Sequence, residues 1–379
     1  MKKLKIGSIA KIGIYLHWTF TLLVGGIFVF YLYQGSSVSA ALIGVGLVLA
    51  LFTCVVLHEL GHALTALHYG VATRDITIYP IGGVARLERI PEEPVKEFWI
   101  ALAGPAVNAA IAAVLFIALY ALGDSLSPIV LLQPDGGSFW ATLMWLNVIL
   151  VGFNLLPAFP MDGGRILRAL LATRLDYAKA SHIAANIGQA MAVLFGVIGF
   201  LVLNPFLIVI ALFVYFGARQ ESQQALMRAV TRGVPVRQVM LTRFGTLSPS
   251  DTLDVAVDEL LSGSDQDFPV ADDGRVVGVL TRRQLMKALA EQGREARISD
   301  IIEPECFTVE DTMLLEDAFA RMNAAQCSTV PVVRGGRLVG LLTLENVGEL
   351  MMVAAALGRA GRSGDVESVL AAHGAGGTS

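Results

Sequence analysis

The chain has 379 residues, of which 55% are hydrophobic and only 16% are charged, and its mean hydropathy is +0.64. Because an ordinary soluble domain has about a quarter charged residues, this composition excludes a wholly soluble protein and indicates an integral protein of a lipid bilayer. The formal net charge of -4 leaves no basic stripe to replace phosphate counterions, which argues against nucleic acid as a partner.

Charged residues divide the chain into two parts. Residues 1–220 contain 13 Lys and Arg and 10 Asp and Glu, whereas residues 221–379 contain 15 and 22. We therefore expect a membrane domain at 1–220, a linker at 221–233 and a soluble, acidic C-terminal part. The basic N-terminal start leads into an apolar run too long for a signal peptide, so the first helix is expected to stay in the protein.

Six apolar runs are long enough for membrane helices, since about 20 helical residues cross a hydrocarbon core of roughly 30 Å. The runs lie at 13–34, 38–67, 98–122, 139–157, 183–203 and 205–218. Asn204 and Pro205 provide the only break between the last two, so one long kinked helix is an alternative there. The predicted fold class is a multi-pass α-helical membrane protein with six transmembrane helices and a C-terminal α/β part.

Basic residues fall on one side of these expected spans. The loops after the first, third and fifth spans contain no Lys or Arg, whereas both ends of the domain and the loops after the second and fourth spans do. Positively charged loops stay in the cytoplasm, which predicts cytoplasmic termini and an even number of spans. Three cysteines cannot form a disulfide framework, which also favours a cytosolic C-terminal part: Cys54, Cys306 and Cys327.

The segment HELGH at 58–62 places two histidines and a glutamate inside an apolar run. On a helix, His58 and His62 project from one face, so both imidazoles can bind one Zn²⁺. Glu59 lies beside them and can take a proton from water that the metal makes more acidic. Ionisable groups in a membrane span are costly, which favours a functional site over a packed helix.

A third protein ligand is needed if one coordination position is to stay open. Asp162 is favoured, because the prolines and glycines of NLLPAFPMDGGR end the fourth span in a bent loop with one acidic group. His68 has the spacing of the metzincin pattern, but that pattern's turning glycine is absent, and a continuous helix points His68 away from His62. Cys54, one turn before the motif, fits better as a small packing residue.

Together, HELGH and NLLPAFPMDGG, which begins at Asn154, resemble the site-2 protease family of intramembrane zinc metalloproteases. The resemblance implies a three-helix catalytic core in which His58, His62 and Asp162 bind zinc. It also implies that Glu59 is the general base and acid, and that Asn154 is a catalytic residue holding the substrate or the oxyanion. The implied substrates are transmembrane proteins, such as anti-sigma factors or other regulatory precursors, of a bacterial or archaeal cell membrane.

Three further segments fit the same family. ALAGPAVN at 101–108 resembles its Gly-Pro-x-x-Asn element, where small residues permit close helix packing and Asn108 offers a polar contact to substrate near the metal. GIYLHW resembles its opening segment, in which His17 and Trp18 are expected at the membrane interface. DITIYPIGGVARLE predicts short strands around a glycine turn. Gly82 and Gly83 either form a strand edge that binds unwound substrate or belong to a hairpin without that role, and the family resemblance favours substrate binding.

The C-terminal part contains an internal repeat. FPVADDGRVVGVLTRRQL and VPVVRGGRLVGLLTLENV align at an offset of 62 residues, which predicts two β-α-β-β-α domains at 234–292 and 296–357. They resemble a tandem pair of CBS domains, a module that often binds adenosine nucleotides. The tail at 358–379 is rich in Gly, Ala and Ser and lacks the apolar density to order itself, so we expect it to be disordered.

The CBS resemblance predicts one nucleotide site. In that family a Thr followed three residues later by Asp holds the nucleotide; Thr343 and Asn346 fit this pattern better than Thr281 and Gln284. The alternative is a homodimerisation or spacer module without a ligand. Nucleotide binding or dimerisation of the pair is expected to control access of substrate to the membrane site.

Two other functional classes also fit part of the sequence. CBS pairs occur on ion channels and transporters, but a transporter does not explain HELGH together with Asp162. An inactive membrane scaffold has no need for two histidines and a glutamate in an apolar span. The sequence is therefore interpreted as that of a protease.

Overall fold

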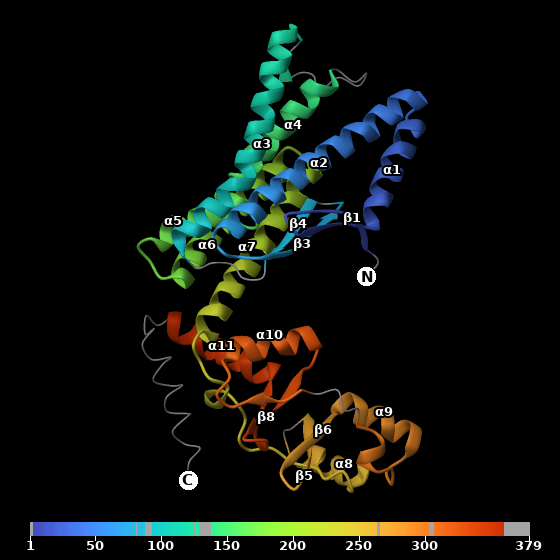
Figure 1. The fold of residues 1–379 in the computed structure, drawn as a ribbon, viewed down its shortest axis with the longest axis vertical. Helices are drawn as coiled ribbons and strands as arrows, with labels where there is room; N and C mark the ends of the chain where they lie inside the picture. Colours follow the sequence, from blue (N-terminus) through green and yellow to red (C-terminus); the bar gives the residue numbers. More distant parts are fainter. Residues whose placement is uncertain are drawn as a thin grey trace. The chain divides into compact units, whose positions relative to one another are not determined.

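The computed structural model consists of two compact units, Met1–Ala225 and Leu226–Ser379, each treated separately below (Figure 1). It describes residues 3–80, 82–87, 93–124, 126–128, 138–263, 266–302 and 307–359. Most of the segment predicted as a linker, 221–233, is the last part of a helix that ends at Thr231.

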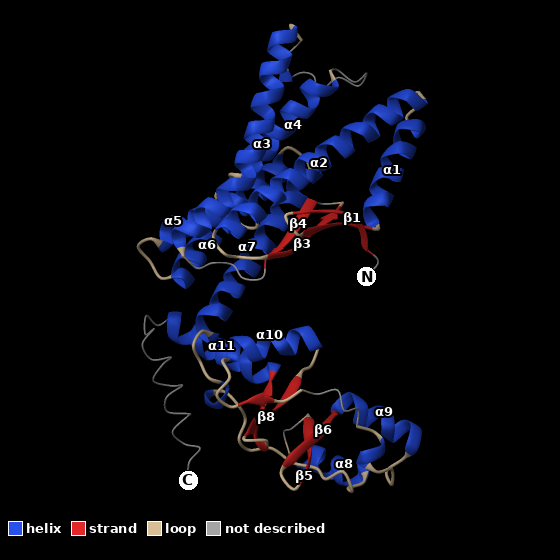
Figure 2. Cartoon of the chain, viewed as in Figure 1, coloured by secondary structure: helices blue, strands red, loops and turns tan. Residues whose placement is uncertain are grey.

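Unit 1 is mainly helical (Figure 2). Its helices are α1 (Thr19–Tyr33), α2 (Val38–His68), α3 (Pro94–Leu122), α4 (Phe139–Asn154), α5 (Asp162–Ala172), α6 (Tyr177–Leu201) and α7 (Pro205–Thr231), the last of which extends into unit 2. Helices α2, α3 and α6 are long and apolar enough to cross a membrane, whereas α1 and α4 are apolar but shorter. Three candidate spans are thus supported by length and composition, and the predicted number of six stays a prediction.

The first predicted span is wrong at its N-terminal end. Residues from 13 onward were expected in a helix, but Ile12–His17 form strand β2 and α1 begins only at Thr19. Ile12 packs in a cluster with Ile76 and Ile78, residues about 60 positions later. An apolar run with β-branched residues suits either element, and here pairing with the neighbouring Lys3–Ile9 and with the distant Thr73–Tyr79 decides for the sheet.

One four-stranded sheet accompanies the helices, in the order β1-β2-β3-β4. Its strands are β1 (Lys3–Ile9), β2 (Ile12–His17), β3 (Thr73–Tyr79) and β4 (Gly82–Leu87). β3 and β4 are antiparallel and pair Tyr79 with Gly82, which confirms the predicted hairpin. The sheet packs through Ile76 and Ile78 against Leu60 and Ala63, which places it along the C-terminal half of α2.

Helices α6 and α7 are separate, antiparallel helices and not one kinked helix. The Asn204 side chain accepts hydrogen bonds from the backbone N–H groups of Phe206 (3.0 Å) and Leu207 (3.4 Å), and so caps the start of α7. A Cβ on Gly199 would lie 2.9 Å from the Cβ of Leu207, so the glycine permits the two helices to meet closely at the turn.

Unit 2 contains the predicted repeat. The elements of the first copy are η2 (Val236–Gln238), α8 (Leu253–Ser262), β5 (Asp267–Asp272), β6 (Arg275–Thr281) and α9 (Arg282–Gln292). Those of the second are η3 (Ile298–Asp300), β7 (Val309–Glu310), α10 (Leu315–Ala325), β8 (Thr329–Arg334), β9 (Arg337–Thr343) and α11 (Leu344–Arg359). Two buried apolar clusters lie in the unit: in one, Val236 of η2 packs with the second copy, and in the other, Ile298 of η3 packs with the first. The predicted disordered tail lies outside the described residues from 360 onward, as does Cys306.

Candidate metal centre

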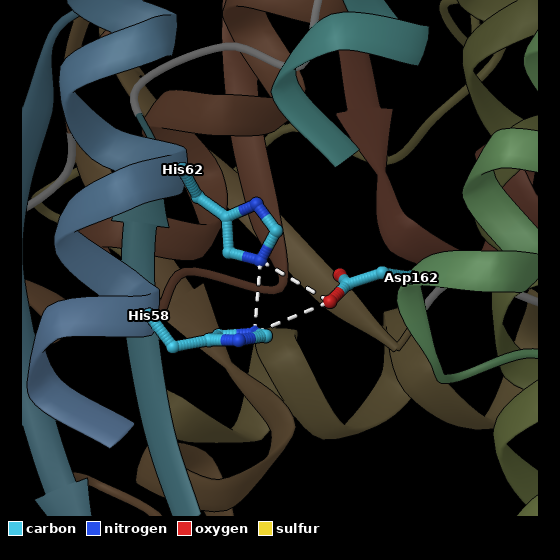
Figure 3. A group of neighbouring side chains, drawn as sticks. All are labelled: His58, His62 and Asp162. Atoms are coloured by element: carbon cyan, nitrogen blue, oxygen red, sulfur yellow. Dashed lines mark hydrogen bonds and ion pairs between the residues drawn. The ribbon is translucent and has the colours of Figure 1, made fainter. Parts of the chain in front are cut away.

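Three buried side chains meet at one point in unit 1, as Figure 3 shows. The Nε2 atoms of His58 and His62 on α2 are 3.1 Å apart, and Oδ2 of Asp162 lies 3.2 Å from each. Ligands at about 2.0–2.1 Å from Zn²⁺ in a tetrahedron stand about 3.3 Å from one another. The spacing of the three atoms therefore fits one zinc ion with a fourth position left open.

The loop between α4 and α5 brings Asp162 to this point from 100 residues away in sequence. A Cβ on Gly163 would lie 2.2 Å from the carbonyl oxygen of Leu156, and one on Gly164 would lie 2.6 Å from the backbone nitrogen of Phe159. Only glycine fits these two close approaches. The glycine pair thus lets the loop fold tightly over the start of α5, where Asp162 is the first helical residue.

Hydrogen bonds behind the imidazoles determine which ring nitrogen carries the proton. Asn147 Nδ2 donates to the carbonyl of Leu143 (2.8 Å), so Asn147 Oδ1 accepts from Asn108 Nδ2 (3.0 Å). Asn108 Oδ1 must then accept from Nδ1–H of His58 (2.8 Å). In the same way, Nδ1–H of His62 donates to the carbonyl of Ile100 (2.6 Å).

Both Nε2 atoms are therefore unprotonated and present lone pairs to the Asp162 carboxylate oxygen and to each other. Three electron-pair donors at this separation repel one another unless a positive charge lies between them. The donor set, as well as its spacing, fits a bound cation.

Gly104 of α3 lies directly against the two imidazoles. A Cβ at this position would be 2.2 Å from Nε2 of His62 and 2.7 Å from Nε2 of His58. Gly61 of α2 likewise permits close packing against α3, because a Cβ added to it would be 3.0 Å from the carbonyl oxygen of Ala103. The small residues of ALAGPAVN and HELGH thus permit α2 and α3 to pack closely at the metal centre.

Glu59 is half-buried and lies between α2 and β4. Its Oε2 accepts a hydrogen bond from the backbone N–H of Ala85 (3.2 Å). A Cβ on Gly83 would lie 2.6 Å from Cγ of Glu59, whereas Gly82 has a φ of 140° that favours glycine for the turn. Within the part of the chain that the structure describes, Oε1 of Glu59 has no hydrogen bond. This oxygen remains available to a water molecule.

Other candidates lie apart from the three ligand atoms. His68 is exposed at the end of α2, and Cys54 is buried with its Sγ 3.5 Å from Nδ2 of Asn147. Asn154 is half-buried at the end of α4 and its side chain makes no hydrogen bond among the described residues. Sequence reasoning missed Asn147, although an Asn in an otherwise apolar helix was a usable signal.

The predicted nucleotide residues of unit 2 act locally as helix caps. Thr343 Oγ1 donates to Oδ1 of Asn346, and the backbone N–H of Asn346 donates to Thr343 Oγ1 (3.1 Å) at the start of α11. Thr281 and Gln284 form a complete capping box at the start of α9. The two pairs therefore have equivalent structural roles, and nucleotide binding stays a prediction.

Comparison with known proteins gave matches to both parts of the chain. The model of Peptidase family M50 matches residues 46–133 and 131–195, and the CBS domain model matches 236–291 and 298–351. A zinc metalloprotease of Methanocaldococcus jannaschii is 36% identical over 307 residues, which cover 81% of this chain and 85% of that protein. Rip3 of Mycobacterium tuberculosis is 28% identical over 327 residues, 82% of this chain and 81% of that protein. The solved site-2 protease structure from M. jannaschii has 42% identity and a TM-score of 0.44, and covers 58% of this chain and 95% of that one.

Proposed function

We propose that this chain, a member of Peptidase family M50, hydrolyses peptide bonds within or near transmembrane segments of membrane proteins. The chain is a zinc metalloprotease of the site-2 type with CBS domains. The observation that carries this proposal is the convergence of His58, His62 and Asp162, because two of the three belong to α2, a helix apolar enough to cross a membrane. The nearest substrate for a hydrolytic centre on such a helix is the transmembrane segment of another membrane protein.

His58, His62 and Asp162 would hold the metal. Zn²⁺ bound there supplies Lewis acidity, which polarises a peptide carbonyl and makes water more acidic. Glu59 takes the proton from the attacking water through Oε1 and then donates it to the leaving amine, so one carboxyl group serves as base and acid in turn. Hydrolysis at membrane depth needs water, which we propose reaches the centre through a cavity lined by protein. Non-helical backbone is tolerated at that depth when it lines such a cavity.

The substrate is bound as an extended chain, because a helix hides its carbonyl groups in its own hydrogen bonds. β4 is an edge strand of the sheet, with Gly83 directly against Glu59. We propose that substrate pairs with β4 near Gly82 and Gly83, beside the catalytic carboxylate. Asn154, at the end of α4, contacts the substrate or the oxyanion.

Asn108 receives a different role from the one that the sequence suggested. Its Oδ1 and Nδ2 are already bonded to His58 and Asn147. We therefore propose that Asn108 orients His58 and does not bind substrate.

In the cell membrane, α1, α2, α3, α4, α6 and α7 cross the bilayer and both termini lie in the cytoplasm. The proposal is supported by the apolar length of α2, α3 and α6 and by the distribution of basic loops. The CBS pair regulates substrate access by binding an adenine nucleotide near Thr343 and Asn346 or by forming a homodimer. Regulatory membrane proteins such as anti-sigma factors are the proposed substrates.

The experiment compares wild type with Glu59→Gln on a panel of single-span proteins in detergent, with bound zinc quantified in both. We expect one zinc per chain in each, and cleavage by wild type alone, because the amide cannot accept the proton. Equal cleavage by the two proteins would remove Glu59 from the mechanism. Absence of zinc from both after metal supplementation would refute the metalloprotease.

A further inference from the structure

An ion cluster is buried a short distance from the metal centre. Arg168 of α5 is 1% exposed; its Nε donates to Glu97 of α3 (2.7 Å) and a terminal nitrogen donates to Glu221 of α7 (2.8 Å). The guanidinium carbon lies 4.9 Å from the ring centroids of both Phe159 and Tyr177. A fully buried arginine is costly even when paired, which suggests that the cluster has a function beyond stability.

The pair of Arg168 with Glu97 joins the two sides of the metal centre. Arg168 follows Asp162 by six residues on the same rigid helix, α5. Glu97 precedes Ile100, the residue whose carbonyl holds His62, by three residues on α3. Seven residues after Glu97, and so on the same face, Gly104 contacts both imidazoles. The ion pair therefore connects the helix that begins with Asp162 to the helix that packs against the two histidines.

Glu221 adds a third helix to this connection. It lies on α7, which continues to Thr231 and so extends into unit 2. One arginine faces two carboxylates, so Arg168 shares its donors between a partner on α3 and a partner on α7. A displacement of α7 would therefore alter the hydrogen bonding of Arg168.

We propose that Arg168 is a positioning residue of the metal centre, which holds Asp162 against His58 and His62, and that Glu221 makes this hold depend on α7. The inference rests on the proposed metal centre and goes beyond it, because none of the three charged residues touches a ligand atom. The planar fork of arginine is suited to bind two carboxylates from two helices at once.

The test uses the full chain in detergent, loaded with Co²⁺, whose visible absorption reports the number and arrangement of its ligands. Co²⁺ affinity and the spectrum are measured for wild type, Arg168→Gln, Arg168→Lys and Glu221→Gln. The matched control is Arg174→Gln, which removes an exposed cation just beyond the end of α5. Asp162→Ala provides the reference for a lost ligand.

Supporting groups behind metal ligands typically change affinity by 10–100-fold, so we expect Arg168→Gln to bind Co²⁺ about 10-fold more weakly and with an altered spectrum. Arg168→Lys restores part of the affinity, because it keeps the charge and loses the fork. Glu221→Gln changes the spectrum less than Arg168→Gln, because the pair with Glu97 remains. Arg174→Gln matches wild type.

A lower melting temperature of Arg168→Gln with wild-type Co²⁺ affinity and spectrum would overturn the proposal, since the arginine would then only stabilise the fold. If Arg168→Gln does not fold, the double variant with Glu97→Gln removes both charges of the pair and is measured in its place. Wild-type Co²⁺ binding by that double variant would equally overturn the proposal. Unchanged Co²⁺ binding by Asp162→Ala would instead refute the metal centre itself.

Discussion

Replacement of Gly104 by alanine is the smallest change that should disable the metal centre. The added Cβ would lie 2.2 Å from Nε2 and 2.5 Å from Cε1 of His62, and 2.7 Å from Nε2 of His58, where ordinary contact is 3.4–4 Å. The imidazoles or helix α3 must therefore shift by more than about 1 Å, and overpacking of this kind costs about 1–3 kcal/mol of stability.

The expected loss of function of Gly104→Ala is larger than its loss of stability. A misplacement of about 1 Å in a catalytic site can lower the rate by about 100-fold, and the side chains displaced here are the two proposed zinc ligands, His58 and His62. We therefore expect kcat/KM for a membrane substrate to fall by about 100-fold, with zinc bound about 10-fold more weakly.

Zinc titration and cleavage kinetics are measured on the purified full chain. Gly196→Ala is the matched control, because its Cβ would meet Ala211 of α7 at 3.6 Å, an ordinary contact on a helix that does not contribute a ligand. Stoichiometric zinc with full activity in Gly104→Ala would refute the close packing of α3 against His58 and His62.

Three further variants separate the roles of neighbouring residues. Asn147→Leu should weaken zinc binding by about 10-fold, because it breaks the hydrogen-bond relay that orients His58; unchanged zinc affinity in a titration would contradict the relay. Gly83→Ala should lower kcat with zinc content unchanged, since the added Cβ would be 2.6 Å from Cγ of Glu59 and away from the proposed metal ligands. Loss of zinc from this variant would contradict the position of β4 beside Glu59. Thr343→Ala should weaken binding of AMP or ATP to the full chain, measured by calorimetry, and equal binding would remove this residue from the nucleotide site.

The spacing within HELGH was enough to predict two of the three residues that meet at the candidate metal centre. The period of a helix places His58 and His62 on one face whatever surrounds them. Prediction of Asp162 needed a further signal, because no local spacing connects it to His62, 100 positions earlier. It was found because prolines and glycines around one acidic residue are unusual at the end of an apolar helix.

Features that depend on pairing with other parts of the chain could not be predicted from the sequence. Strand β2 looks like the start of a membrane helix, but it pairs with β1 beside it in the sequence and, through Gly13 and Asp75, with the more distant β3. Arg168 was counted among the basic residues of a cytoplasmic loop, because its side chain gives no sign of burial without Glu97 and Glu221, 71 and 53 residues away. A charged residue can be recognised as buried only once its partners are placed around it.

We propose above that zinc held by His58, His62 and Asp162 takes part in hydrolysis of peptide bonds inside the membrane. The most direct measurement is mass spectrometry of the fragments that the wild-type protein produces from a single-span substrate in lipid vesicles. We expect a new terminus within or at the edge of the apolar segment, and in Asp162→Ala we expect this terminus and the bound zinc to be lost together. Cleavage confined to soluble domains, or cleavage that persists in Asp162→Ala, would contradict it.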